Sequence, residues 1–241
     1  KDCEEGIIKG MYLYQEADKP KGKAKTPRVQ LLACGVVLRE ALKAAELLDK
    51  EFGVKADVWS CPSFTELSRD GFDAERWNRL HPNPREQRKA YVTECLDKHE
   101  GPVVAATDYV RALSDQVRAF IPHGRRFTTL GTDGYGRSDT RTHLLDFFEV
   151  NAHWIAHAAI ATLAEDGAMN AQDVERAIKT WGLEPYKPNP ITVSVGIDAG
   201  PPPLAGRPRA DPTTLARTAK NRANQASVIL RARFDARMCM W

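Results

Sequence analysis

The sequence predicts an α/β fold, a three-layer α/β/α domain with a mostly parallel sheet of about five strands. Three observations support this prediction. Short apolar segments alternate with longer segments of helical periodicity through most of the chain. Glycine or proline lies at most of the junctions between them. The segments that separate successive strands are long enough for the crossover connections that parallel strands require.

The first predicted unit is a strand, a helix and a second strand. Residues 29–34 form a short apolar strand, and Gly35 turns the chain into a helix whose apolar positions recur at helical spacing as far as Leu48. Gly53 ends this helix, and residues 56–60 form the next strand. A β-α-β unit implies parallel strands joined by a right-handed crossover.

The next two predicted elements are helices. Ser63 is the expected N-cap of the first, with Glu66 three residues later as its capping-box partner. This helix passes Leu80 and ends at the proline-containing residues 81–84. Residues 91–98 form a second, short helix.

The rest of the domain contains two more strands and four more helices. The strands are expected at residues 102–106 and 127–130, on either side of an amphipathic helix at 108–121 that Pro122 closes. A glycine-rich turn follows the last strand. The three further helices are expected at residues 141–148, 152–165 and 171–181.

Composition divides the chain into three regions. Residues 1–27 are expected to be the end of a preceding domain plus a linker, because residues 15–27 carry lysines spaced by proline and glycine. Residues 28–190 form the α/β domain. Residues 191–241 form a basic tail rich in Pro, Arg and Ala, whose composition predicts disorder. Because the chain begins at Lys1, without a signal peptide, we expect it to be a fragment of a longer protein.

Composition also limits the class of protein. Of the 241 residues, 42% are hydrophobic and 28% charged, and no apolar run approaches the roughly 18 to 20 residues that a membrane span needs. The five cysteines include no C-x-x-C pair, which argues against a disulfide framework and favours the cytoplasm. The net charge of +3 originates in the tail, since residues 191–241 carry +5 and the rest −2. We therefore expect neither a nucleic acid nor a membrane as partner.

The segment from Gly131 to Asp139 is the main candidate site. It follows a strand and precedes a helix, so its backbone amides are expected at the carboxyl edge of the sheet, where open α/β folds bind ligands. Its glycine spacing, G-x-x-G-x-G, differs from the dinucleotide fingerprint, and a tight turn with a helix cap at Ser138 or Asp139 is the simpler interpretation. The candidate residues for an active-site mouth or interface are Asp133, Tyr135, Arg137, Ser138 and Asp139.

Other combinations are interpreted as structural. A thiamine diphosphate motif binds Mg²⁺ through a Gly-Asp-Gly turn and a downstream Asn, but here Thr132 replaces the first glycine and Asn151 follows Asp133 too soon. His153 and His157 have the spacing of a metal pair but lack the Glu of H-E-x-x-H, which favours core or interface positions. G-x-S-x-G is absent. Residue chemistry alone therefore gives no catalytic, cofactor-binding or metal residue.

Several segments, taken in order, carry a resemblance to a known family. They are Val29-Gln-Leu-Leu, Ala56-Asp-Val-Trp-Ser, Ser63-Phe-Thr-Glu-Leu-Ser-Arg-Asp-Gly71, Glu75-Arg-Trp-Asn78, Leu80-His-Pro82, Ala105-Ala-Thr-Asp-Tyr109, Leu130-Gly-Thr-Asp-Gly-Tyr-Gly-Arg-Ser-Asp139, Phe148-Glu-Val and Lys187-Pro-Asn-Pro190. From about Glu4 to Pro190 the chain resembles the carboxy-terminal domain of the homodimeric first component of bacterial pyruvate dehydrogenase complexes. Relatives of this kind end soon after the last segment, so the tail is either an extension or a frameshift product.

The resemblance implies a transketolase-like architecture, with residues 1–27 ending the pyrimidine-binding domain. Earlier domains would hold thiamine diphosphate and Mg²⁺, so the fragment alone would bind neither and be inactive. The parent enzyme would oxidatively decarboxylate pyruvate and acetylate lipoyl groups, with a second subunit of a homodimer and a lipoyl-bearing acyltransferase core as partners. This domain would serve dimer contact and active-site support. The alternatives are an independent nucleotide-binding or regulatory α/β domain and a non-catalytic interaction module.

Overall fold

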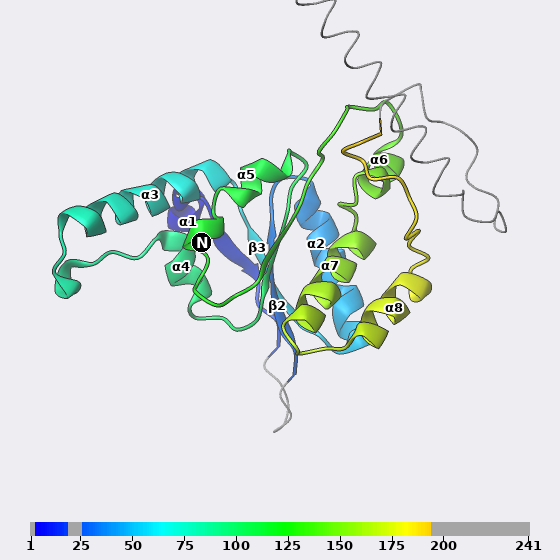
Figure 1. The fold of residues 1–241 in the computed structure, drawn as a ribbon, viewed down its shortest axis with the longest axis horizontal. Coiled ribbons are helices and arrows are strands. Elements are labelled where there is room, and N and C mark those ends of the chain that lie inside the picture. Colours follow the sequence, from blue (N-terminus) through cyan, green and yellow to red (C-terminus); the bar gives the residue numbers. More distant parts are fainter. Residues whose placement is uncertain (1–2, 19–25, 194–241) are drawn as a thin grey trace, which may run out of the picture. The chain divides into compact units, whose positions relative to one another are not determined.

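The computed structural model describes residues 3–18 and 26–193. Figure 1 shows the arrangement of the elements in this part of the chain. The strands are β1 (Tyr12–Gln15), β2 (Arg28–Ala33), β3 (Lys55–Ser60), β4 (Val103–Ala106) and β5 (Phe127–Leu130). The α-helices are α1 (Glu4–Lys9), α2 (Val37–Leu47), α3 (Phe64–Leu80), α4 (Tyr91–Leu96), α5 (Arg111–Asp115), α6 (Arg141–Phe147), α7 (Ala152–Glu165) and α8 (Ala171–Thr180). A π-helical turn covers Leu48–Phe52, and 3₁₀ turns cover Pro84–Glu86 and Arg118–Phe120.

The five strands form one sheet in the order β1-β3-β2-β4-β5. The pairs β2–β3, β2–β4 and β4–β5 are parallel, and only β1 runs antiparallel, along β3 at one edge. The predicted three-layer α/β domain with a mostly parallel sheet is therefore confirmed.

Helices cover both faces of the sheet, which makes the central strands almost continuously apolar. Alternate residues of β2 enter different cores: Leu31 packs with α2 and α7, whereas Leu32 packs with α3 and α4. Figure 1 shows α2, α7 and α8 on one side of the sheet and α3, α4 and α5 on the other. Because β2, β4 and β5 are parallel, their carboxyl ends lie at one common edge of the sheet.

The edge strand β1 was not predicted from the sequence. Residues 12–15 fall in the expected lead-in, yet Tyr12 pairs with Ser60 of β3 and Met11 is completely buried. Because β1 has only four residues, its alternation of apolar and polar side chains is too short to distinguish a strand from a linker. The sheet thus begins before residue 28.

The helix predicted over residues 108–121 is wrong in part. The structure has α5, which is five residues long, and then a separate 3₁₀ turn. Ser114 is buried and its hydroxyl donates to the carbonyl of Arg111, a local bond that competes with a continuing helix. The amphipathic pattern predicted burial correctly but not the length of the element.

The predicted N-cap of α3 is confirmed, although the capping box is not complete. The Ser63 hydroxyl accepts the backbone N–H of Glu66 at 3.1 Å. The backbone N–H of Ser63 donates to the carbonyl of Gly10, and the Glu66 carboxylate pairs with Arg69 instead. The first turn of α3 is therefore attached to the end of α1.

Some predictions concern residues that the structure does not describe. The lysine-rich part of the linker, residues 19–25, and the predicted disordered tail beyond residue 193 lie outside the described residues. Within the described residues, no helix is long and apolar enough to cross a membrane. The four described cysteines are all free.

Candidate functional site

The glycine-rich loop lies at the carboxyl end of β5, as predicted, and is pressed against the loop after β4. A Cβ on Gly131 would lie 2.7 Å from both the carbonyl oxygen of Tyr109 and the backbone nitrogen of Arg111. The N–H of Thr132 donates to the carbonyl of Tyr109 at 2.8 Å. Only glycine allows this approach of two backbones at residue 131.

Asp133 fastens the loop to α5. Its carboxylate accepts the backbone N–H of Arg111 at 3.1 Å and the side-chain Nε–H of the same residue at 2.5 Å. Asn151 has a separate structural role, because its side chain accepts the N–H of Trp154 as the N-cap of α7 and donates to Asp146. These two oxygen-bearing side chains are therefore engaged at different places, Asp133 with α5 and Asn151 with the start of α7.

The other candidate residues of the loop face solvent. Tyr135 is 63% exposed, and Ser138 is also exposed. The Arg137 guanidinium lies 4.1 Å from the centre of the Phe147 ring, a cation–π contact that orients it along α6. This part of the loop presents an aromatic ring and a cation without a partner carboxylate for Arg137 among the described residues.

The predicted helix cap at Ser138 or Asp139 is wrong by one or two residues. The N-cap of α6 is Thr140, whose hydroxyl accepts the N–H of His143. Asp139 accepts the N–H of Thr140 at 2.6 Å, and this bond, followed by that from His143, lowers the pKa of the Asp139 carboxyl. Asp139 is thus an exposed carboxylate that holds the start of α6.

A pocket of about 230 Å³ adjoins the loop at this edge of the sheet. It lies between the Arg111–Asp133 ion pair and a second pair, Lys187 with Glu149 at 3.5 Å. Glu149 has φ of 61°, a left-handed conformation that costs a non-glycine residue on the order of 1 kcal/mol or more. Each of the four charged side chains that line the pocket thus has an ion-pair partner among the described residues.

The final segment of the described domain closes over the loop. A Cβ on Gly134, whose φ is +101°, would lie 2.3 Å from the carbonyl oxygen of Pro190. Lys187 donates to the carbonyl of Asp146 at 2.6 Å and lies over the Trp154 ring. The loop is therefore held from both sides, by α5 and by the segment that ends at Pro190.

The two histidines of α7 have different surroundings in the structure. His153 is exposed and stacks on Trp181 of the α8 end, with ring centres 5.9 Å apart. The ring of His157 is largely buried, which lowers its pKa, and its Nε2 has no hydrogen-bond partner among the described residues. No group of three or more possible metal ligands occurs within the described residues.

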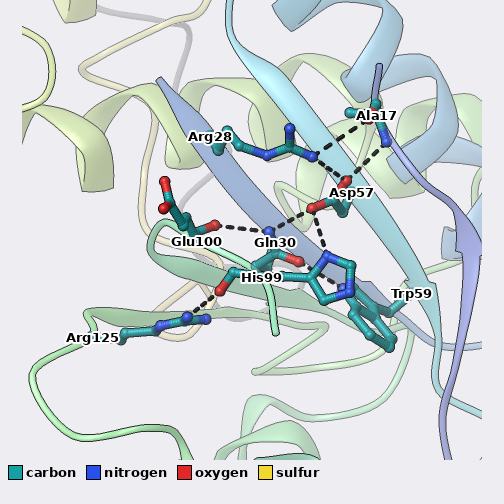
Figure 2. A network of polar contacts seen from close by, with 8 residues as sticks. All are labelled: Ala17, Arg28, Gln30, Asp57, Trp59, His99, Glu100 and Arg125. Carbon is teal, nitrogen blue, oxygen red and sulfur yellow. Dashed lines mark hydrogen bonds and ion pairs between the residues drawn. The ribbon is translucent and has the colours of Figure 1, made fainter. Parts of the chain in front are cut away.

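Sequence reasoning missed a buried polar network at the opposite end of the sheet. Figure 2 shows Arg28, Gln30 and His99 converging on Asp57, which is completely buried. The donors Arg28 and Gln30 lie 2.8 Å from the carboxylate, His99 lies 3.2 Å away, and the backbone N–H of Ala17 donates at 2.8 Å. Two polar residues, Gln30 and Asp57, inside otherwise apolar strands were the available signal.

The network keeps Asp57 ionised. Burial alone would raise the pKa of its carboxyl, but the hydrogen bonds from Ala17 and Gln30, with the charge of Arg28, outweigh burial and lower it. The same contacts hold Ala17, just after β1, against Arg28, where the chain enters β2. We call this network the buried clasp: it joins the chain just after β1 to the start of β2 and to β3. It lies at the end of the sheet opposite the glycine-rich loop.

The sequence of this chain is similar to proteins of a known family. The model of the transketolase-like TK C-terminal domain matches residues 10–151. A pyruvate dehydrogenase E1 component of Cupriavidus necator is 49% identical over 190 residues, which cover 79% of this chain and 21% of that protein. The E1 component of Pseudomonas aeruginosa is 50% identical over 191 residues, with the same two coverages, and that of Escherichia coli K12 is 43% identical over 188 residues, covering 78% and 20%.

The solved structures to which this chain was matched include the transketolase of Leishmania mexicana. It is 21% identical, covers 70% of this chain and 21% of that chain, and has a TM-score of 0.44. The chain spans about a fifth of the length of the curated relatives that it matches.

Proposed function

This chain belongs to the transketolase-like C-terminal domain family, and from this premise we propose that it serves as the C-terminal domain of a pyruvate dehydrogenase E1 component. The observation that carries the proposal is the identity of 49% over 190 residues with the Cupriavidus necator component. The remaining four fifths of such an enzyme would come from other domains.

The proposed enzyme oxidatively decarboxylates pyruvate and transfers the acetyl group to a lipoyl group of an acyltransferase core. Asp133 and Asn151 do not fit Mg²⁺ as a ligand pair, because Asp133 is bound to Arg111 and Asn151 caps α7. We assign thiamine diphosphate and Mg²⁺ to other domains of the parent protein. The isolated chain is accordingly expected to be inactive.

In the parent enzyme, this domain would support the active site and contribute to the dimer contact. At Gly131 and Gly134 the loop packs closely against the backbones of residues 109–111 and of Pro190. Tyr135 and Arg137 project from it into solvent, where they could touch a neighbouring domain or the second subunit of a homodimer. We propose that this loop lies at the mouth of the active site, in a cytoplasmic complex.

The rival function is nucleotide binding by an independent domain. The carboxyl edge of the sheet is the expected place for it, but the pocket there is small and its charges are paired. Calorimetric titration of the chain with ATP separates the two functions. Micromolar binding would favour the independent domain, and no measurable heat is expected.

Sequencing the transcript upstream of Lys1 tests the proposal without any protein. The expected result is an open reading frame that carries a Gly-Asp-Gly segment followed, about 30 residues on, by Asn, the oxygen ligands that Mg²⁺ uses with a diphosphate. A stop codon directly upstream, with a start codon of its own, would refute the assignment to a larger enzyme.

A further inference from the structure

A cavity of about 510 Å³ lies at the amino end of the sheet, opposite the edge that carries the glycine-rich loop. One wall is the chain that enters β2 at residues 26–28, a second is the turn before β4 at residues 100–102, and a third is the chain just after α7 at residues 166–168. The cavity shares no residue with the pocket beside the glycine-rich loop. Its volume is in the range of pockets that hold small molecules.

Hydrogen bonds of the sheet hold two of these walls in place. The carbonyl of Pro27 accepts the N–H of Lys55 at 2.9 Å, and the carbonyl of Pro102 accepts the N–H of Gln30 at 2.9 Å. The sheet itself therefore shapes this part of the cavity. A site that is shaped before a ligand arrives binds it at lower entropic cost.

Arg125 brings to the cavity a guanidinium group that the protein satisfies only in part. Its Nη2 donates to the carbonyl of His99 (Figure 2), but its Nη1 is shielded from water and has no hydrogen-bond partner among the described residues. Burial lowers the pKa of Arg125, and the nearby carboxylates of Asp97 and Glu100 only oppose this shift. A shielded, charged donor without an acceptor is costly to the fold, and an anion beside Nη1 would remove that cost.

The other charged side chains that line the cavity are paired or solvated. Arg28 belongs to the buried clasp, and Asp166 pairs with Arg126 at 3.9 Å. Glu100 has no ion-pair partner among the described residues, but it is exposed, so water solvates its carboxylate. Among the described charged groups of the cavity, the guanidinium of Arg125 is therefore the one that a ligand would compensate.

Most of the remaining lining is apolar. It consists of Thr26, Pro27, Pro102, Leu163 and Ala168 with the backbone of two glycines. A guanidinium binds a carboxylate through parallel hydrogen bonds, and the apolar groups suit a hydrocarbon part of the same ligand. An inorganic anion would use the first feature and not the second.

We propose that this cavity is a binding site for a small organic acid, whose carboxylate is held by the Arg125 guanidinium and whose apolar part contacts Pro27, Pro102 and Leu163. The flexible stem of Arg125 allows Nη1 to turn from the protein toward the carboxylate. The proposal goes beyond the proposed function and does not rest on it, because the cavity lies at the other end of the sheet from the proposed active-site mouth.

Calorimetric titration of the full chain with hexanoate tests the site, because hexanoate joins one carboxylate to an apolar chain. Binding is expected with a Kd below about 1 mM. Arg125→Gln removes the charge and keeps a polar side chain, and it should weaken binding at least about tenfold. Circular dichroism melts show whether the variant keeps its fold.

A second measurement locates the ligand without any substitution. In ¹H–¹⁵N spectra of the unchanged chain, hexanoate should shift the backbone amide signals of residues 100, 101 and 166–168, which line the cavity. The amide signals of the glycine-rich loop should stay where they are. Shifts confined to other parts of the chain would place the ligand elsewhere and overturn the proposal.

Arg118→Gln is the matched control, because Arg118 also donates to a backbone carbonyl, that of Phe127, but does not line the cavity. It should leave the affinity for hexanoate unchanged. Inorganic phosphate is the second probe and should bind more weakly than hexanoate, since it has no apolar part. No heat with hexanoate, an equal loss in the two variants, or tighter binding of phosphate would each overturn the proposal. None of these results affects the assignment to a pyruvate dehydrogenase, which the upstream sequence decides independently.

Discussion

Replacing Asp57 with Asn perturbs the buried clasp with the least change of shape. The carboxylate accepts hydrogen bonds on both oxygens, from Ala17 and Arg28 on Oδ1 and from Gln30 and His99 on Oδ2. An amide has only one oxygen, so its NH₂ group must face one of these two pairs of donors. Asp57 is 0% exposed, and water cannot replace the lost acceptor.

The expected loss of unfolding free energy is about 3 to 5 kcal/mol, the usual result of removing one partner from a buried ion pair. Urea denaturation followed by circular dichroism measures it. Asp115→Asn is the matched control, because that carboxylate pairs with Arg118 at the surface and exposed pairs contribute only about 0 to 1 kcal/mol. A loss below about 1 kcal/mol for Asp57→Asn would refute the reasoning.

The pH dependence gives a second check on the same variant. The pKa of Asp57 is lower in the folded state than its ordinary value of 3.8. Its stabilising effect is therefore complete above that value and is lost as the pH falls through the lower folded-state pKa. The difference between the unchanged chain and the variant should be constant at neutral pH and shrink only in acid.

Three further predictions follow from named contacts. Gly71→Ala should lower the free energy of unfolding, measured by urea denaturation, by about 1 to 3 kcal/mol, because the new Cβ would lie 2.4 Å from the Phe120 ring. Gly136→Ala is the control and should leave this free energy nearly unchanged, because no atom lies within 4 Å of its Cβ. Equal effects of the two substitutions would contradict this reasoning. Burial lowers the pKa of His157 in the folded state below its ordinary value of 6.5, so protonation favours unfolding and the chain should lose thermal stability as the pH falls below 6.5. His157→Leu should reduce this loss. An unchanged dependence of the melting temperature on pH would show that His157 is not the group responsible. Arg137→Ala in a full-length enzyme that carries this domain should lower turnover without shifting the melting temperature, and full activity would exclude a role at the mouth.

The elements that could be predicted from the sequence are those with a regular apolar pattern. Four strands, the helices α2, α3, α4, α6, α7 and α8, and the position of the glycine-rich loop follow from apolar periodicity and from punctuation by Gly and Pro. The break after α5 did not, because it depends on a hydroxyl of Ser114 that bonds locally once it is buried. The edge strand β1 depends on pairing with β3, a contact between residues far apart in the sequence.

The position of the candidate site after the last strand was predicted from the sequence, but the contacts of its side chains were not. Nothing in the sequence shows that Asp133 binds Arg111, because the two residues meet only when β4 and β5 lie side by side. The cap at Thr140 instead of Ser138 or Asp139 is a shift that local propensity cannot resolve, since all three residue types cap helices. The buried clasp around Asp57 required knowledge of which strands are central.

Pyruvate turnover by a domain graft tests the central claim most directly. The matching 191-residue segment of the Pseudomonas aeruginosa E1 component is replaced with the corresponding segment of this chain, and pyruvate-dependent release of CO₂ is compared with that of the parent and of a version that lacks the segment. If this chain is the C-terminal domain of such an enzyme, the graft recovers activity that the deletion has lost. A graft that folds and melts like the parent but remains as inactive as the deletion would contradict the claim.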